Sequence, residues 1–170
     1  SQSMERVAHA QESATVWDEA VTEARRTPPD LNWLDLNLGI WFEDYAGIDE
    51  VYILDARDRA IYAMRDGKRV RPENYIAVED VADPLVALLR RTHSVKHRKE
   101  ADVAMLSPGH ADLAIVRGRP AIISVKPIVG DSGMLRQAPG TEAMHLAIVY
   151  LDDEFFAGVR EQYGIAGAHH

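Results

Sequence analysis

Residues 112–127, DLAIVRGRPAIISVKP, form the stretch of sequence that decides the fold. Two runs of apolar and β-branched residues flank a short segment that contains Gly118 and Arg119, which is typical of a β-hairpin. With these two residues as the loop of a type II′ turn, Leu113 is expected opposite Ser124. The stretch therefore predicts two adjacent antiparallel strands.

The expected register divides the second strand into an apolar face and a mixed face. The apolar face carries Ala121, Ile123 and Val125. The mixed face carries Ile122, Ser124 and Lys126. The mixed face is unusual, because it places a lysine in the middle of an otherwise apolar strand.

Lys126 is open to three interpretations. A lysine on a core-facing strand position is costly unless it is paired or reaches water. It could hold the acidic group of a small ligand beside Ser124. The structural alternatives are a partner carboxylate, for which Asp55, Asp66 and Asp112 are candidates, or an edge strand whose lysine discourages aggregation.

Three further strands are expected outside this hairpin. Residues 51–54 and 60–64 are short β-rich runs that predict an earlier hairpin, and Asp66-Gly67 marks the turn after it. A loop rich in Gly, Pro and Ser at 130–140 precedes a strand near 144–151. The sequence thus predicts five strands, joined mainly by hairpins.

The earlier hairpin carries two tyrosines and a methionine, which could line the same cavity as Lys126. As plain core residues they need no such role. The candidate ligand-binding residues are Tyr52, Tyr62, Met64, Ser124 and Lys126.

A long helix is predicted at 4–27, ended by Pro28 and Pro29. At 1.5 Å per residue it would be about 34 Å long. Apolar residues spaced alternately three and four apart suit a helix that lies across a sheet or pairs with a second copy, so a homodimer through this helix is expected. The stripe consists of Val7, Ala10, Ala14, Trp17, Val21 and Ala24.

Three shorter helices complete the expected fold. Asp30 is predicted to cap a second helix that ends at Gly47. Asp83-Pro84 is predicted to begin a third helix, and a short exit helix is expected at 152–163. The fold class is therefore α+β, with the long N-terminal helix packed across a five-stranded antiparallel sheet.

The composition limits the possible functions. The chain has 170 residues, 19 basic and 27 acidic side chains, a formal net charge of −8 and no cysteine. This length fits one domain with one core. The lack of cysteine excludes disulfides, thiolate zinc sites and a cysteine nucleophile, and the negative charge argues against nucleic acid as a partner.

The chain lacks the common catalytic motifs GxGxxG, GxxxxGK[ST], GxSxG and HExxH, so we predict neither an enzyme nor a cofactor. His93 and His97 stand four apart, but the surrounding cations oppose a metal ion and favour a solvated basic face. His110 and Asp112 could be a base and its orienting group. No nucleophile accompanies them, and a small enzyme built on this pair is the weakest alternative.

Two motifs near the N-terminus resemble those of a known family. Trp17-Asp18-Glu19 resembles the Trp-Asp-Asp signature of the fourth class of CHASE domain, an extracytoplasmic sensor of bacterial membrane-bound signalling proteins. The stretch that contains Trp33 and Asn37 is similar to the asparagine motif in the second helix of that class. These motif residues are expected to serve folding or signalling.

The two hairpins extend the resemblance. Residues 51–63, with Asp55, resemble the first hairpin of the class, which Asp-Gly usually closes. Here Asp58 stands in the glycine position, and aspartate tolerates a positive φ better than most residues. Residues 118–128 resemble the later hairpin.

The resemblance implies a PAS/Cache-like sheet in a single periplasmic sensor domain over residues 4–163. It also implies one transmembrane helix before this domain and a second after it, in an inner-membrane protein. The expected parts are a long helix at 4–27, a sensor core at 30–151, an exit helix at 152–163 and a cloning remnant at 1–3.

The class further implies a parent protein with GGDEF and often EAL modules, which make and degrade cyclic di-GMP. Any such activity would belong to the parent. The domain is expected to bind an unidentified small ligand and to transmit helix shifts across the membrane. Lys126 would favour an anionic ligand. The alternatives are the sensor of a histidine kinase or chemoreceptor, or a dimerisation or protein-binding module without a ligand.

Overall fold

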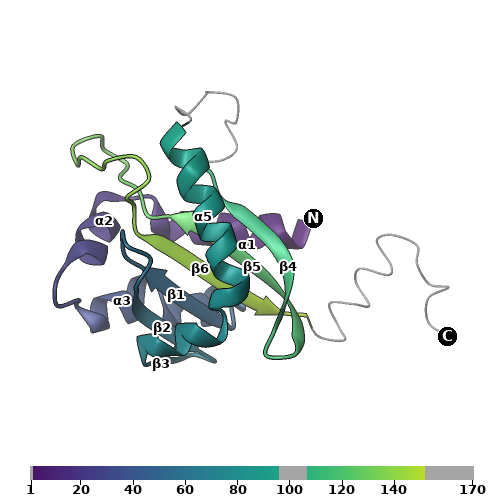
Figure 1. Ribbon diagram of the computed structural model, residues 1–170. Coiled ribbons are helices and arrows are strands. Elements are labelled where there is room, and N and C mark those ends of the chain that lie inside the picture. The colour runs from purple at the N-terminus through teal and green to yellow at the C-terminus, as the bar shows by residue number, and fades with distance from the viewer. Residues whose placement is uncertain (1, 96–106, 152–170) are drawn as a thin grey trace, which may run out of the picture.

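The computed structural model describes residues 2–95 and 107–151. Six strands form one antiparallel sheet in the order β3-β2-β1-β6-β5-β4 (Figure 1). β6, the last of the described strands along the chain, lies between β1 and β5 and so joins the two hairpins. The strands are β1 Glu50–Leu54, β2 Ala60–Arg65, β3 Lys68–Val70, β4 His110–Val116, β5 Arg119–Pro127 and β6 Met144–Tyr150.

The α+β class and the antiparallel sheet are confirmed, but the prediction of five strands is wrong. The sixth strand is β3, which pairs with β2 through the turn at Asp66-Gly67. Three residues, two of them basic, are too few to show an alternating pattern. The earlier hairpin of β1 and β2 is present as expected, and Asp58 adopts a φ of 63° in its turn.

The turn between β4 and β5 differs from the expected one. Arg117 and Gly118 have φ values of 52° and 74°, so these two residues form the loop, which has the positive φ values of a type I′ turn. Leu113 consequently pairs with Ile122 rather than with Ser124. This shift of two residues leaves every side chain on its expected face, because strand side chains alternate with a period of two.

Helices cover both faces of the sheet (Figure 1). Helices α1 to α4 pack on one face, and the 3₁₀ helix η1 and α5 pack on the other. None of the helices within the described ranges is both long enough and apolar enough to span a membrane. Their bounds are α1 Gln2–Thr15, α2 Asp18–Arg25, α3 Leu31–Asn37, α4 Ile40–Ala46, η1 Pro72–Ala77 and α5 Glu79–Val95.

The single long helix predicted at 4–27 is wrong, because the chain breaks between α1 and α2. Val16 forms a parallel bridge with Val129, whose N–H donates to the carbonyl of Thr15 at 2.9 Å. Trp17 is extended, with φ −168° and ψ 151°. The loop after β5 therefore takes over backbone groups that would continue the helix. The pairing of two copies through this helix stays a prediction.

The predicted second helix is also divided, into α3 and α4. Its ends are confirmed: Asp30 accepts a hydrogen bond from the N–H of Trp33, and Gly47 ends α4 in the left-handed conformation. The break falls at Gly39, where a Cβ atom would lie 1.9 Å from the hydroxyl of Tyr62. The ring of Tyr62 thus occupies the space that a side chain at this position would need.

Helix α5 begins at Glu79, so the predicted start at Asp83-Pro84 is wrong. The carbonyl of Val78 accepts hydrogen bonds from Val81 and Ala82, which starts the helix directly from η1. Pro84 lies inside the helix and removes one backbone donor there. The exit helix expected at 152–163 lies outside the described residues.

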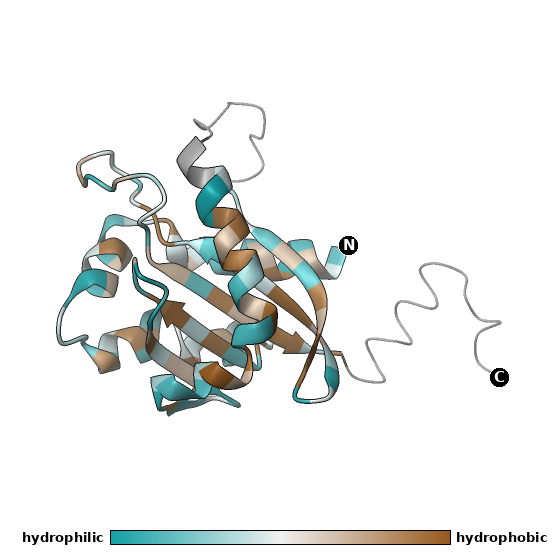
Figure 2. Cartoon of the chain, in the orientation of Figure 1, coloured by the Kyte–Doolittle hydropathy of each residue, from teal (hydrophilic) through white to brown (hydrophobic). Residues whose placement is uncertain are grey.

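Each face of the sheet has its own hydrophobic core. Tyr52, Leu54 and Leu146 belong to the core beneath α5, whereas Val51 and Ile53 belong to the core beneath α1 to α4. Figure 2 shows the hydrophobic colour concentrated on the central strands. The domain therefore has three layers, with the sheet in the middle.

Candidate functional site

The side of α1 that faces the sheet is polar in its middle. Gln11 and Glu12 are buried there, between the apolar residues Val7 and Ala14, and Thr15 is buried at the end of the helix. Buried polar groups are costly unless they find hydrogen-bond partners. The partners of Gln11 and Glu12 lie on β5 and β6.

Gln11 connects α1 to both central strands. Its Oε1 accepts a hydrogen bond from Ser124 Oγ at 2.7 Å. Its Nε2 lies 3.1 Å from the carbonyl oxygens of Ser124 and His145 and 3.0 Å from His145 Nδ1. Both polar atoms of this amide, Oε1 and Nε2, therefore contact polar groups of β5 and β6 at the centre of the sheet.

His145 carries the connection on to the segment between α3 and α4. Its Nε2 lies 2.8 Å from the carbonyl of Leu38, so Nε2 carries the proton and donates, while Nδ1 accepts from Gln11. The ring is completely buried, and burial lowers its pKa to about 4, although the bond to Leu38 acts in the opposite direction. His145 is therefore neutral near pH 7.

Lys126 forms a second connection to α1. Its Nζ lies 3.1 Å from Glu12 Oε1 and donates to the carbonyl of Ser107 at 2.7 Å. Both side chains of the ion pair are almost completely buried. Burial lowers the pKa of the Lys126 ammonium, and Glu12 partly offsets this effect. The ion pair thus joins α1 to β5 next to the Gln11 contacts.

We call these five side chains the α1 clamp: Gln11, Glu12, Ser124, Lys126 and His145. Every contact between them depends on the position of α1 along its own axis. A shift by one helical turn, about 5.4 Å, would separate the buried groups from their partners. The clamp can therefore hold the helix in one register on the sheet.

The structure separates the predicted ligand-binding residues. Ser124 and Lys126 lie in the α1 clamp, and Tyr62 and Met64 belong to the core on the same face of the sheet. Tyr52 lies on the opposite face, in the core beneath α5. The five residues do not come together around one cavity, and ligand binding by them stays a prediction.

The two tyrosines have partners of their own. The hydroxyl of Tyr62 donates to Asp35, which also accepts from Arg69. The hydroxyl of Tyr52 donates to Glu50 at 2.5 Å. Burial and these acceptors raise the pKa of both phenols, so both stay protonated.

Glu50 lies in a second buried cluster, which anchors the β4–β5 turn to the end of the sheet. It accepts hydrogen bonds from the hydroxyl groups of Tyr52 and Tyr150. Arg117, at the turn, lies 3.3 Å from each Glu50 carboxylate oxygen. Burial raises the pKa of Glu50, but these donors outweigh it and lower the pKa overall. Because these three side chains engage the Glu50 carboxylate, the cluster has a structural role.

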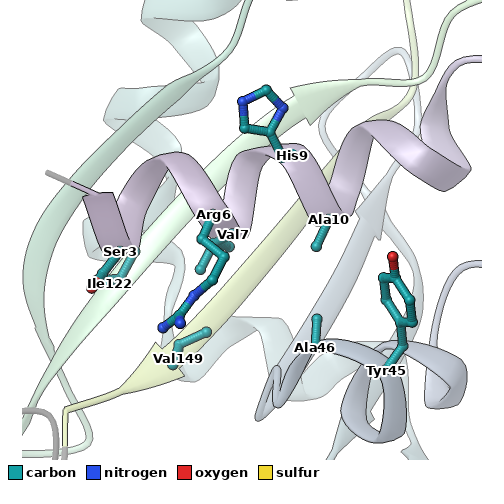
Figure 3. A pocket seen from close by; sticks show the side chains of 9 residues that line it. All are labelled: Ser3, Arg6, Val7, His9, Ala10, Tyr45, Ala46, Ile122 and Val149. Carbon is teal, nitrogen blue, oxygen red and sulfur yellow. The ribbon is translucent and has the colours of Figure 1, made fainter.

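A groove lies between α1 and α4 on the face that carries the clamp. It has a volume of about 430 Å³. Figure 3 shows Ala10 and Ala46 facing each other across it, with Arg6 extended over Val149 and His9 directed away. We call it the α1–α4 groove; its lining residues are Ser3, Arg6, Val7, His9, Ala10, Tyr45, Ala46, Ile122 and Val149.

The aromatic motif residues near the N-terminus hold helices together. Trp17 and Trp33 stack with their ring centres 5.5 Å apart. The indole N–H of Trp33 donates to Glu19, and the amide of Asn37 donates to the carbonyl of Trp33. These contacts join α2 to α3 and stabilise α3 itself.

The two aspartates of the motifs bind backbone groups. Asp18 accepts from the N–H of Asp131 and from both the N–H and the hydroxyl of Ser132. This fixes the loop after β5 against the start of α2. Asp55 accepts from the N–H groups of Arg57 and Arg59 and so closes the β1–β2 turn. Both carboxylates thus organise loops.

The candidate metal pair lies partly outside the described residues, and the candidate enzyme pair is separated. His97 lies outside the described residues, and the described ranges contain no cluster of three or more metal-binding side chains. His110 lies 3.3 Å from the hydroxyl of Thr92, and Asp112 accepts from the N–H of Leu113. Within residues 2–95 and 107–151, His110 and Asp112 are therefore engaged separately.

Sequence reasoning missed Gln11, Glu12 and His145 as functional residues. One signal was available, because Gln11 lies four residues after Val7 and three before Ala14 and so falls on the apolar stripe. His145 likewise interrupts an apolar strand. What the sequence could not show is that these residues lie opposite one another.

The comparison with protein families gives one match. Residues 1–169, essentially the whole chain, match the model of the CHASE4 domain. No curated protein matches the chain.

Proposed function

Because the chain belongs to the CHASE4 family of extracellular sensor domains, we propose that it is the signal-input domain of a membrane-anchored signalling protein. In this proposal a small ligand binds on the face covered by α1 to α4 and changes the position of α1. The α1 clamp converts binding into that change. The domain itself is a sensor domain and not a catalyst.

The α1 clamp is the observation that carries the proposal. Polar groups that are buried between a helix and a sheet have few arrangements in which all are paired. Each lost partner costs about 1–3 kcal/mol, so intermediate positions of α1 are disfavoured. A ligand that binds one arrangement better by a few kcal/mol can then switch the population.

The type of parent protein is a finer proposal. The resemblance of the motifs favours a parent with GGDEF and EAL modules that make or degrade cyclic di-GMP. A histidine kinase or a chemoreceptor would use the same input. The domain would then lie in the periplasm, between flanking transmembrane helices that anchor the parent in the inner membrane.

The location can be tested with one engineered cysteine. The chain has no cysteine, and Ala56 is exposed in the β1–β2 turn. An Ala56→Cys variant of the full-length protein should react with a membrane-impermeant maleimide in intact cells, and the unchanged protein measures the background. Labelling that appears only after lysis contradicts the extracytoplasmic location.

The role of the clamp can be tested by output in the full-length protein. Gln11→Leu removes the contacts to β5 and β6 and should shift the basal output several-fold. Asn32→Leu also replaces an amide by leucine, at an exposed position of α3, and should leave the output unchanged. Equal outputs for the two variants would refute coupling through the clamp.

A further inference from the structure

The α1–α4 groove exists because small residues meet across it. Ser3, Val7 and Ala10 recur at helical spacing and place one side of α1 against the groove. Ala10 faces Ala46 of α4, so neither helix fills the space between them (Figure 3). Below them lie Ile122 and Val149, which pair across β5 and β6. The groove thus has apolar walls and an apolar floor.

One guanidinium group lies in this apolar groove. Arg6 is exposed and extends over Val149 (Figure 3). Within residues 2–95 and 107–151 its side chain has no carboxylate or other hydrogen-bonding partner, and no acidic residue lines the groove. His9 points away from the groove and lies 3.8 Å from Glu12. The electrostatic character of the groove is therefore set by a single cation.

An aromatic side chain forms one end of the groove. The ring of Tyr45 stacks on Trp41 with the ring centres 4.3 Å apart, which fixes its orientation, yet Tyr45 remains 59% exposed. Its hydroxyl has no partner within the described ranges. A ring held at the edge of an apolar groove provides contact area at little entropic cost.

We infer that the α1–α4 groove binds a small aliphatic monocarboxylate. Arg6 receives the carboxylate through its two parallel N–H donors, and the alkyl chain lies between Ala10 and Ala46. A single guanidinium matches one carboxylate, and the apolar remainder of the groove disfavours a more highly charged anion. This inference names the ligand class of the sensor proposed above and rests on that function.

The position of the groove links such a ligand to the α1 clamp. Ala10 precedes Gln11 directly on α1. On the other side, α4 follows Leu38, whose carbonyl accepts from His145. A molecule held between α1 and α4 therefore contacts the helix that carries Gln11 and the helix that follows the Leu38 carbonyl bound by His145. Binding and clamp geometry are coupled through this short connection.

The test uses octanoate as the probe, measured by calorimetric titration and by the change in Tm. 1-Octanol and octylammonium serve as probes of the same chain length without the negative charge. Octanoate should bind and raise Tm, and octylammonium should not. If no shift occurs with octanoate, or if the three probes bind equally, the inference is wrong.

Two variants locate the binding in the groove. Arg6→Gln should weaken octanoate binding about tenfold or more, because it removes a charge-assisted hydrogen bond. Arg57→Gln makes the same change at an exposed turn and should bind as the unchanged protein does. Equal weakening by both variants would show that only the net charge matters and would overturn the site.

Filling the groove gives an independent check. Ala46→Leu places a larger side chain opposite Ala10 and should abolish binding of octanoate. Its Tm without the probe shows whether the variant folds, and Ala10→Leu provides a second way to fill the same space. Full binding by a folded variant contradicts the inference. If octanoate fails to bind while Gln11→Leu still shifts the output, the ligand class is wrong and the proposed function stands.

Discussion

Acidification should destabilise the domain through His145. The ring is neutral in the folded protein, with Nε2 donating to Leu38 and Nδ1 accepting from Gln11. A proton added to Nδ1 would face the Gln11 amide nitrogen, which is itself a donor. The clamp would then lose one of its hydrogen bonds and contain an additional buried charge.

A cation on the adjacent strand also disfavours protonation of His145. Lys126 is the cross-strand partner of His145 on β5, so a protonated ring would lie beside another buried cation. Glu12, on α1, pairs with Lys126. The elements that contact His145 on the other sides provide the amide of Gln11, the carbonyl of Leu38 and the ring of Phe42.

The size of the stability loss follows from the pKa values of His145 in the folded and in the unfolded state. Burial lowers the pKa of His145 from 6.5 to about 4 in the folded state. Because the folded pKa is the lower one, the unfolded state binds the proton first, and stability is present above 6.5 and lost as pH falls. The loss is about 1 kcal/mol by about pH 5.5 and approaches about 3 kcal/mol below about pH 4.

The assay is urea unfolding, followed by tryptophan fluorescence, between about pH 7.5 and about pH 5. His145→Gln retains a donor but does not titrate, so the unchanged protein should lose about 1 kcal/mol more than this variant by about pH 5.5. Parallel pH profiles for the unchanged protein and His145→Gln would refute the reasoning.

Three further predictions concern stability and can be checked by the same unfolding assay. Lys126→Met should destabilise by about 3–5 kcal/mol, because Glu12 then lacks its buried cation, and the double variant with Glu12→Leu should recover most of the loss. Arg90→Ala should cost about 2–4 kcal/mol, since Arg90 donates to Asp58 and to three backbone carbonyls, and Arg90→Lys should recover less than half. Gly39→Ala should cost about 1–3 kcal/mol in the unchanged protein and less in a Tyr62→Ala background. Additive losses in the double variants would contradict the first and third predictions.

The sheet was predictable because alternation is a local property of the sequence. The faces of β5 were placed correctly although the turn was displaced, because a shift of two residues preserves the alternation. The helix caps at Asp30 and Gly47 were likewise predictable from local chemistry. The break at Val16 was not, because it depends on Val129, which reaches α1 only in the folded chain.

The candidate site was predictable only in part for the same physical reason. Lys126 stood out as an anomaly in its strand, and a buried carboxylate partner was one of the interpretations. The candidate partners considered were Asp55, Asp66 and Asp112, whereas the actual partner is Glu12 on the first helix. A pattern in one segment can show that a buried charge needs a partner. It cannot show which distant segment provides it.

The choice of polar groups for this interface has a mechanical consequence. An apolar interface between a helix and a sheet loses little when the helix slides by a fraction of a turn, because hydrophobic contact is non-directional. Hydrogen bonds from Gln11 and the ion pair of Glu12 are directional and are lost within a short displacement. A helix held by such groups is therefore either fixed in one register on the sheet or free to move along it. Because the α1–α4 groove adjoins these same groups, a ligand there needs to supply only the difference between the two states.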